Sequence, residues 1–210
     1  MPKAWIKERK REYYYRKAKE EKYRSRAAYK LLQVAEKYRF MKPSDVVVDL
    51  GASPGGWLQV SRRLVGAKGF VLGVDLNHVP PFNLSNVYTI VGDITDPQTV
   101  SEIKEVLPYP ADVVISDVSP NISGIWELDH ARQIDLARKS LQIAISILKP
   151  KGSFFTKVFQ GDMLKGFLNE VKQHFGFVKL IKPKASRTRS AELYILALDF
   201  MKTHDKIKAS

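Results

Sequence analysis

The fold is decided by residues 46–57, which read VVVDLGASPGGW. The stretch opens with a short apolar run, as expected of a strand that is buried on both faces of a sheet. A loop of glycine, alanine, serine and proline follows, and residues 57–65 then show helical periodicity. This order of strand, glycine-rich loop and helix is typical of the first unit of a parallel α/β sheet, in which ligands bind beyond the carboxyl ends of the strands.

Strands and helices alternate through the rest of the chain, which predicts a mainly parallel sheet with helices on both faces. About ten residues separate the last two predicted strands, too few for a helical crossover, so we expect the final strand to be antiparallel to its neighbour. After residues 46–50, further strands are predicted at residues 70–76, 87–91, 111–117, 153–159, 177–181 and 193–200. Further helices are predicted at residues 97–107, 127–148 and 162–174.

The composition excludes several classes of protein. The chain has 210 residues, with 35 Lys and Arg, 22 Asp and Glu, no Cys and a formal net charge of +13. A hydrophobic content of 44% is enough for a core and excludes wholesale disorder. The missing cysteines exclude a disulfide framework, a thiolate zinc site and a cysteine nucleophile, and they fit a reducing compartment, so we expect a cytoplasmic protein. No apolar stretch of about 18 residues occurs, so we expect no membrane-spanning segment.

The positive charge is concentrated at the N-terminus. Residues 1–44 hold 15 Lys and Arg against 5 Asp and Glu, whereas residues 45–210 hold 20 against 17. We predict a solvated arm over residues 1–22, followed by a helix with Ser25 as its N-cap and an end at Pro43. The chain is therefore divided into a basic arm and helix, a main domain and a short tail, at residues 1–44, 45–202 and 203–210.

Three acidic residues lie at the ends of predicted strands, beside the glycine-rich loop. Asp75 could accept both hydroxyls of a ribose, and Asp93 could accept from the exocyclic amine of adenine. A dinucleotide would favour Gly-x-Gly-x-x-Gly, but Ser53 takes the third position here. Asp49 would repel a pyrophosphate and attract an ammonium or sulfonium group, which favours S-adenosylmethionine (SAM). The alternative is that these residues only form turns, and it is weaker for the set than for any one residue.

Four charged residues occupy positions that suggest catalysis. Asp117 and Glu192 lie at strand ends, Lys157 lies inside an apolar strand, and Lys30 lies on the N-terminal helix. Lysine is seldom buried unless it is paired or functional. Two lysines with two carboxylates would form a nearly neutral set, which lowers the cost of burial. The alternatives are lysine stems with exposed heads, and carboxylates that serve turns or the surface.

Five segments of the chain resemble, in sequence and in order, the motifs of one protein family. They are RSRAAYKL at residues 24–31, DLGASPGGW at 49–57, SDVSPNISG at 116–124, TKVFQG at 156–161, and Arg187, Ser190, Ala191, Glu192 and Tyr194 near the last strand. Together they resemble the FtsJ/RrmJ-like family of SAM-dependent RNA 2′-O-ribose methyltransferases, over about residues 24 to 200. Ser53 stands where many members have alanine, a change between small residues.

The resemblance implies a Rossmann-like methyltransferase fold with seven strands, and a reaction that converts SAM to S-adenosylhomocysteine. We expect no metal, because methyl transfer develops no phosphoryl charge. The resemblance implies a catalytic tetrad at Lys30, Asp117, Lys157 and Glu192. It implies SAM contacts at Gly55, Trp57, Asp75, Asp93 and Asp117. The expected target is a uridine ribose of large-subunit (23S-type) ribosomal RNA, in the peptidyl-transferase region.

The expected chemistry is in-line displacement at the methyl of SAM by a ribose 2′-oxygen. Lys157 is the candidate for handling the proton of the hydroxyl, and it can accept that proton only in its neutral form. Lys30 nearby would favour the neutral form, whereas Asp117 and Glu192 would favour the charged form. A charged Lys157 would instead orient the hydroxyl and stabilise developing negative charge on oxygen. Both possibilities remain open on the sequence.

The expected partner is RNA, because charge asymmetry of this kind indicates nucleic acid or an anionic membrane and the motifs indicate RNA. Tyr13, Tyr14 and Tyr15 could stack on unpaired bases. A second basic cluster precedes the last strand, at Lys179, Lys182, Lys184, Arg187 and Arg189. No protein partner is indicated, and the four histidines, at positions 78, 130, 174 and 204, have no metal-ligand spacing.

Other functions remain as alternatives. Within the same chemistry, the target could be a transfer RNA anticodon loop or a messenger RNA cap. A non-catalytic RNA-binding protein could use the same scaffold, although the intact tetrad argues against it. A nicotinamide-dependent oxidoreductase is disfavoured by Ser53 and Asp49.

Overall fold

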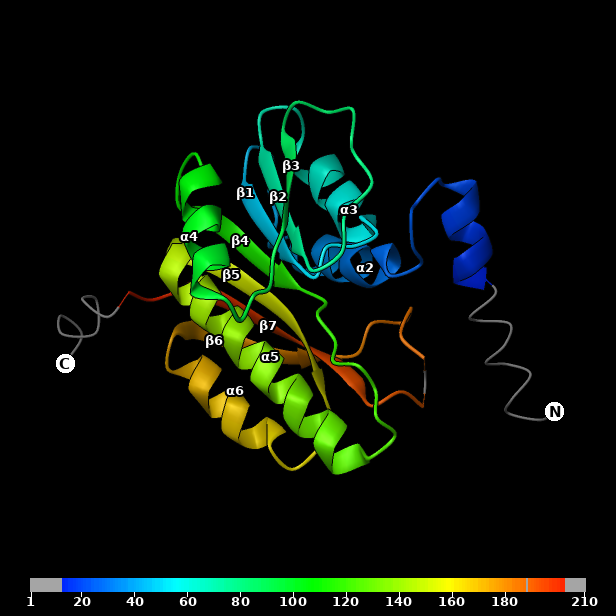
Figure 1. The fold of residues 1–210 in the computed structure, drawn as a ribbon, viewed down its shortest axis with the longest axis vertical. Coiled ribbons are helices and arrows are strands. Elements are labelled where there is room, and N and C mark those ends of the chain that lie inside the picture. Colours follow the sequence, from blue (N-terminus) through cyan, green and yellow to red (C-terminus); the bar gives the residue numbers. More distant parts are fainter. Residues whose placement is uncertain (1–12, 188, 203–210) are drawn as a thin grey trace.

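A computed structural model describes residues 13–187 and 189–202, which form one seven-stranded sheet with helices on both faces (Figure 1). The strand order is β3-β2-β1-β4-β5-β7-β6. The strands are β1 (Val46–Leu50), β2 (Phe70–Asp75), β3 (Val87–Val91), β4 (Ala111–Ser116), β5 (Leu148–Phe159), β6 (Phe175–Ile181) and β7 (Glu192–Phe200). The helices are α2 (Ala28–Tyr38), α3 (Gly56–Val65), α4 (Pro97–Val106), α5 (Trp126–Ile147) and α6 (Leu164–Lys172).

The pairing of the strands confirms the predicted sheet. β1 to β5 are parallel to their neighbours among themselves, whereas β7 lies antiparallel between β5 and β6. The short connection between β6 and β7 leaves no room for a crossover, so the chain must turn back. The predicted start of the fifth strand at residue 153 is wrong. Leu148 already pairs with Ala111, and a register shift follows before Ser153 pairs with Val113.

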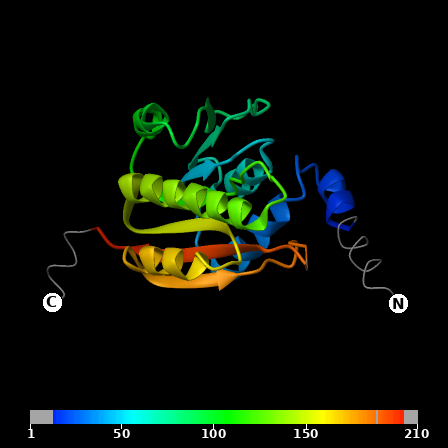
Figure 2. The same ribbon diagram turned by 60° about the horizontal axis from the view of Figure 1, so that its bottom comes forward.

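Each face of the sheet carries its own hydrophobic core. One core packs under α4, α5 and α6, and the other packs under α2 and α3 (Figure 2). Successive residues of β1 supply both, since Val47 belongs to the second core whereas Val46 and Val48 belong to the first. A strand covered on both faces explains the continuous apolar run from which the fold was predicted.

The N-terminal segment differs from its prediction. Residues 13–20 are helical, and they pack on the second core through Ala18, while the Tyr14 hydroxyl accepts a hydrogen bond from Gln33 (2.9 Å). The segment is therefore more than a solvated arm, although its outer side is exposed. Residues 1–12 of that arm and the tail at residues 203–210 lie outside the described residues.

Helix α2 also has different ends from those predicted. Ala27 is its N-cap, with no side-chain cap, so the assignment of Ser25 to this role is wrong. The helix ends at Arg39, which adopts the left-handed conformation (φ 49°), and does not extend to Pro43. Along the described chain, no helix has both the length and the apolar character needed to cross a membrane.

Candidate active site

The glycine-rich loop connects β1 to α3 at the carboxyl end of the parallel strands. Gly51 has a φ of +81°, and a Cβ on it would lie 2.9 Å from the backbone nitrogen of Val118. Gly55 has a φ of +108°, and a Cβ there would lie 2.8 Å from the Arg24 guanidinium. Glycine is therefore required at both places by conformation and by space. The glycines therefore let Val118 and Arg24 pack closely against the loop.

Asp49 is the unusual group beneath this loop. It is fully buried, and neither carboxylate oxygen has a hydrogen-bond partner in the described protein. Burial, together with the negative charges of Asp117 and Asp75, raises the pKa of Asp49 well above its usual value. A buried carboxyl without a partner is unfavourable. This site is therefore suited to a cationic group of a ligand.

The other two predicted strand-end acids have local partners. Asp75 accepts hydrogen bonds from the backbone N–H groups of Ser53 (2.9 Å) and Asn77 (2.7 Å), so it holds the glycine-rich loop against the end of β2. Asp93 follows β3, the strand next to β2, and it is exposed. One of its oxygens accepts from the backbone of Thr95 (2.8 Å).

Trp57 contributes to the core rather than to an open surface. Its ring is buried and stacks on Phe155, with centroids 5.6 Å apart, and its indole N–H donates to the Ala27 carbonyl (2.8 Å). Any ligand contact by Trp57 would therefore come from its backbone. The indole instead ties α3 to the start of α2.

The four residues predicted as a catalytic tetrad lie together. Lys30 and Glu192 form an ion pair (2.7 Å). Lys157 contacts Asp117 twice, at a carboxylate oxygen (3.3 Å) and at the backbone carbonyl (2.7 Å). The two lysines are 8% and 6% exposed, so their heads do not reach bulk solvent as free surface charges. The set contains two positive and two negative groups, which reduces the cost of burying them.

Tyr194 joins the two ion pairs, and sequence reasoning assigned it no role. Its hydroxyl donates to Asp117 (2.8 Å) and accepts from Lys30 (3.2 Å). Burial and the charges of Asp117 and Glu192 raise the pKa of Tyr194 well above its usual value. The sequence could have indicated this role, because Tyr194 follows Glu192 by two positions in a predicted strand and its side chain therefore lies on the same face of the sheet.

Asp117 is held in its ionised form. Burial alone would raise its pKa, but the ammonium groups of Lys157 and Lys30 and the hydrogen bond from Tyr194 outweigh burial and lower the pKa below its usual value. Asp49, on the neighbouring strand β1, has no such partners among the residues that the structure describes, and its pKa moves the opposite way. One end of the sheet thus holds a paired carboxylate and an unpaired one.

A further layer of hydrogen bonds fixes the tetrad. Ser186 donates to the second oxygen of Glu192 (2.8 Å), and the backbone of Glu192 donates to the Ser190 hydroxyl (3.2 Å). Gln133 on α5 donates to the carbonyl of Lys157 (3.2 Å). A pocket of about 240 Å³ opens at this end of the sheet. The ion pair of Lys30 and Glu192 lines it, together with Arg26, Arg187 and Ser190.

Arg24 connects the N-terminal segment to the loops around the glycine-rich turn. Its guanidinium donates to the carbonyls of Pro80 (2.5 Å) and Pro81 (2.8 Å) and lies 3.7 Å from the centre of the Phe82 ring. It also donates to the Pro54 carbonyl (3.3 Å). Arg24 belongs to the motif at residues 24–31, but the sequence alone gave it no role, because a motif does not show which groups a side chain contacts.

Comparison with known proteins decides the family. The model of the FtsJ-like methyltransferase family matches residues 23–200. Ribosomal RNA large subunit methyltransferase E of Methanocaldococcus jannaschii is 50% identical, over 98% of this chain and 87% of its own length. The protein of the same name from Methanothrix thermoacetophila is 54% identical, over 89% of this chain and 71% of its own length.

The chain belongs to the FtsJ-like methyltransferase family.

Solved structures agree with this assignment. A ribosomal RNA methyltransferase from Plasmodium falciparum superposes with a TM-score of 0.76 at 27% identity, over 86% of this chain and 100% of its own. A methyltransferase from Streptococcus mutans, solved with S-adenosylhomocysteine, shares the fold at a TM-score of 0.51 and 15% identity, over 80% and 97%. The sheet of this FtsJ-like protein is thus the SAM-dependent methyltransferase fold, as expected. Residues 13–187 and 189–202 contain no cluster of three metal-ligating side chains.

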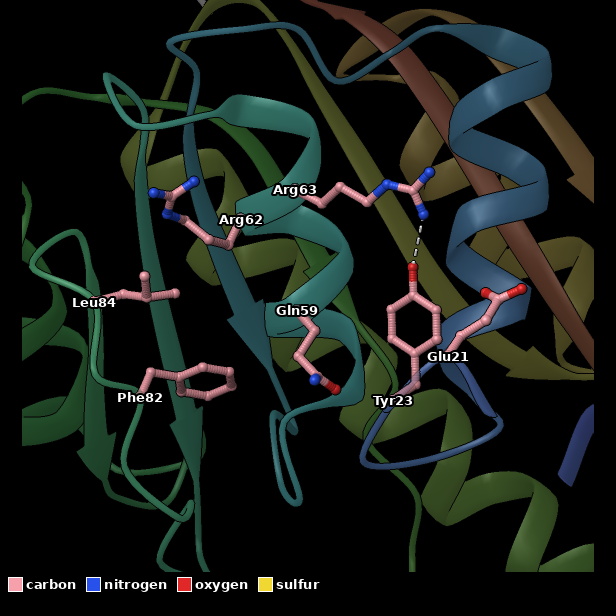
Figure 3. Close-up of a pocket in the computed structure, with 7 residues that line it drawn as sticks. All are labelled: Glu21, Tyr23, Gln59, Arg62, Arg63, Phe82 and Leu84. Atoms are coloured by element: carbon pink, nitrogen blue, oxygen red, sulfur yellow. Dashed lines mark hydrogen bonds between the residues drawn. The ribbon is translucent and has the colours of Figure 1, made fainter. Parts of the chain in front are cut away.

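A larger hollow in this FtsJ-like methyltransferase lies on the outer side of α3. It has a volume of about 650 Å³ and contains none of the predicted site residues. Figure 3 shows Arg62 extending from α3 toward the side on which Phe82 and Leu84 lie, and Arg63 extending from α3 to the opposite side, toward Tyr23. Arg63 donates to the Tyr23 hydroxyl (3.0 Å). The hollow is therefore basic and aromatic, and it adjoins the N-terminal segment.

Proposed function

We propose that this chain transfers a methyl group from SAM to a ribose 2′-oxygen of large-subunit ribosomal RNA, at a uridine. The observation that carries the proposal is the network of two buried lysine–carboxylate pairs, Lys30 with Glu192 and Lys157 with Asp117, which lies beside the glycine-rich loop. The names of the relatives support ribosomal RNA as the substrate.

The residues around the loop fit SAM. The unpaired carboxyl of Asp49 suits a positively charged group, and SAM carries such groups at its sulfur and its amine. We keep Gly55 as a SAM contact through its backbone, while Asp75 and Asp93 offer carboxylates at the ends of adjacent strands. When bound, SAM supplies an electrophilic methyl group, so the protein needs only to position and activate the acceptor oxygen.

In this proposal the tetrad acts on the ribose hydroxyl. Lys157, held by two contacts to Asp117, orients the hydroxyl and in its neutral form takes up the hydroxyl proton. As the 2′-oxygen bonds to the methyl group, the bond between that methyl and the sulfur of SAM breaks and S-adenosylhomocysteine leaves. Asp117 remains ionised and keeps Lys157 in place. Lys30 and Glu192 occupy the pocket side of the network, where the ribose enters.

The RNA chain would approach over basic surface. Arg26 and Arg187 line the pocket beside the tetrad, and the second basic cluster of the sequence, residues 179–189, is exposed at each described Lys and Arg. We keep residues 1–44 as a basic RNA-binding part that also supplies Lys30. Contacts to phosphates predict binding that weakens steeply with salt. The proposal includes the cytoplasmic location expected for a chain without cysteine.

The test is incubation with unmodified ribosomal and transfer RNA and tritiated SAM, followed by mapping of 2′-O-methyl sites. Lys157→Ala should abolish transfer and retain SAM binding, whereas Lys104→Ala, at an exposed lysine of α4, should leave both unchanged. Asp93→Ala should mainly weaken SAM binding. Near-normal turnover by Lys157→Ala would contradict the proposal. Methylation confined to transfer RNA or a cap would replace the substrate, and RNA binding without transfer would favour the non-catalytic alternative.

A further inference from the structure

The loop between β4 and α5 carries a group of exposed apolar side chains beside the candidate active site. Ile122 is 64% exposed, Ile125 is 60% exposed, and Trp126, the first residue of α5, is 45% exposed. Exposed apolar groups that adjoin one another commonly mark a binding surface. This loop contains most of the motif at residues 116–124. Of that motif, only Asp117 belongs to the predicted tetrad and SAM contacts, so the other residues have no assigned role.

We propose that Trp126 is a stacking platform for an unpaired base of the RNA next to the target ribose. This inference rests on the proposed RNA substrate, and it adds a second contact for the RNA beside the tetrad, through Phe159, which pairs with the pocket residue Glu192. The RNA chain would lay its phosphates over the arginines of that pocket and one base over the Trp126 ring.

The platform is held rigidly. Asp129, which is buried, accepts three hydrogen bonds from the loop: two from Ser123, at its backbone (2.8 Å) and its hydroxyl (2.7 Å), and one from the backbone of Gly124 (3.1 Å). These hydrogen bonds, those from Ser123 above all, lower the pKa of the Asp129 carboxyl, so it remains ionised and continues to accept. A loop fixed in this way presents its apolar side chains without first having to be ordered, which favours binding.

The Trp126 ring is supported by other rings. It stacks on His130, one turn along α5, with centroids 5.8 Å apart and planes 17° apart. It also stacks on Phe159 at the end of β5, at 6.1 Å and 23°. Tight support of this kind fixes the orientation of the indole, while almost half of its surface remains exposed.

The position of Phe159 links the platform to the tetrad. Phe159 is paired with Glu192 across the antiparallel β5–β7 ladder, and Lys157 is paired with Tyr194 two residues earlier. Residues that face each other in such a ladder point to the same side of the sheet. The stack of Trp126 on Phe159 therefore begins one side chain away from the network that would hold the ribose.

A base is the occupant that this geometry favours. A base joined to the ribose chain lies within one nucleotide of the target oxygen, and its flat apolar face matches an indole held in a fixed plane. Figures 1 and 2 both show the β4–α5 loop, the start of α2 and the β6–β7 connection at the same end of the sheet. An RNA strand that crosses the tetrad from the basic pocket therefore meets Trp126.

The experiment compares Trp126→Ala, Trp126→Phe and Tyr109→Ala in methyl transfer to a naked ribosomal RNA fragment. Tyr109 is a matched control, because it is 74% exposed and precedes β4, at the opposite end of the sheet. Loss of one stacked base predicts a rise in KM for RNA of about tenfold with Trp126→Ala. Trp126→Phe should restore most of the affinity, and Tyr109→Ala should have no effect. The KM for SAM should not move.

A binding measurement separates this inference from the proposed function. In a Trp5→Phe background the only tryptophans are Trp126 and the buried Trp57, and a single-stranded oligoribonucleotide should quench the emission of Trp126. Quenching without methyl transfer would sustain the platform and overturn the proposed function. Transfer with an unchanged KM for Trp126→Ala would overturn the platform alone. A defect seen only on ribosomal subunits, and not on naked RNA, would assign the surface to a protein and also overturn the proposal.

Discussion

Replacing Asp49 by asparagine should stabilise the protein without SAM and weaken its binding of SAM. The reason is the buried carboxyl, which has no hydrogen-bond partner for either oxygen within the described protein. Burial and the charges of Asp117 and Asp75 raise its pKa well above the usual 3.8. Above pH 3.8 the unfolded chain loses the proton that the folded protein keeps, so folding becomes less favourable as the pH rises toward the folded pKa.

The magnitude has an upper limit. A raised pKa can lower the stability at pH 7 by at most about 4 kcal/mol, because pH 7 lies about 3 units above the usual value and each unit is worth about 1.4 kcal/mol. The amide of the Asp49→Asn variant does not titrate, but it would itself lack hydrogen-bond partners, which costs about 1–3 kcal/mol. The net gain is therefore at most about 1–3 kcal/mol. In a chain of this size, a gain of about 1–3 kcal/mol corresponds to a rise of about 2–12 °C in Tm.

The assay is thermal unfolding of the protein without SAM between pH 5 and pH 8, by circular dichroism, followed by titration with SAM. Asp49→Asn should have the higher Tm at pH 7, and the advantage over the wild type should shrink as the pH falls. Affinity for SAM should drop about 10- to 100-fold, as expected for the loss of one charge-assisted contact.

The matched control is Asp112→Asn, on β4. Asp112 accepts from the backbone of Val46 (2.8 Å) and forms an ion pair with Lys149, so its neutralisation should lower the Tm and leave SAM binding unchanged. A lower Tm for Asp49→Asn at pH 7, or a difference from the wild type that does not vary with pH, would refute the reasoning about the unpaired carboxyl.

Three further substitutions test separate contacts. Tyr194→Phe removes a hydrogen bond to the ionised Asp117, so kcat should fall about tenfold with an unchanged KM for SAM; an unchanged kcat would show that the bridge is dispensable. Arg24→Ala removes donors to three carbonyls around the cofactor loop and should raise the KM for SAM more than that for RNA; the reverse order would assign Arg24 to RNA. Gly51→Ala should lower stability by about 2–4 kcal/mol in urea unfolding, because its Cβ would meet the backbone of Val118 and its φ is positive; wild-type stability would contradict this.

The sheet was predictable because its signals are local. Residues 46–50 form an apolar run whose length and composition define a buried strand, and the short link before residues 193–200 forces an antiparallel return. Element ends were less predictable. Arg39 follows the last residue of α2 in a left-handed conformation, which is usually predicted from a glycine, and no glycine is present there. Leu148 belongs to β5 because of a register shift, which depends on the partner strand β4.

The candidate site divides in the same way. The four tetrad residues could be predicted from the sequence, because each is a charged residue in a helix or strand position where charge is unusual. They are Lys30, Asp117, Lys157 and Glu192. Tyr194 does not stand out in this way, because tyrosine is common in strands and its role is defined by two partners 77 and 164 positions away. Asp49 was assigned to a cation from its place beside the loop, but its lack of partners is a property of the folded surroundings.

The two roles proposed for the N-terminal part of the chain, RNA binding and the supply of Lys30, cannot be separated by truncation. This part carries much of the positive charge, yet Ser25 lies against Gly56 and the carbonyl of Ala27 accepts from the Trp57 indole, so its backbone packs on the start of α3. One turn later, Lys30 reaches Glu192. Removal of residues 1–44 would therefore expose the second hydrophobic core, remove the contacts to the start of α3 after the glycine-rich loop, and delete Lys30. These losses would add to any weakening of RNA binding. Charge reversal at exposed positions of the helical residues 13–20 is the change that isolates the electrostatic contribution, since it leaves Lys30 and its supports in place.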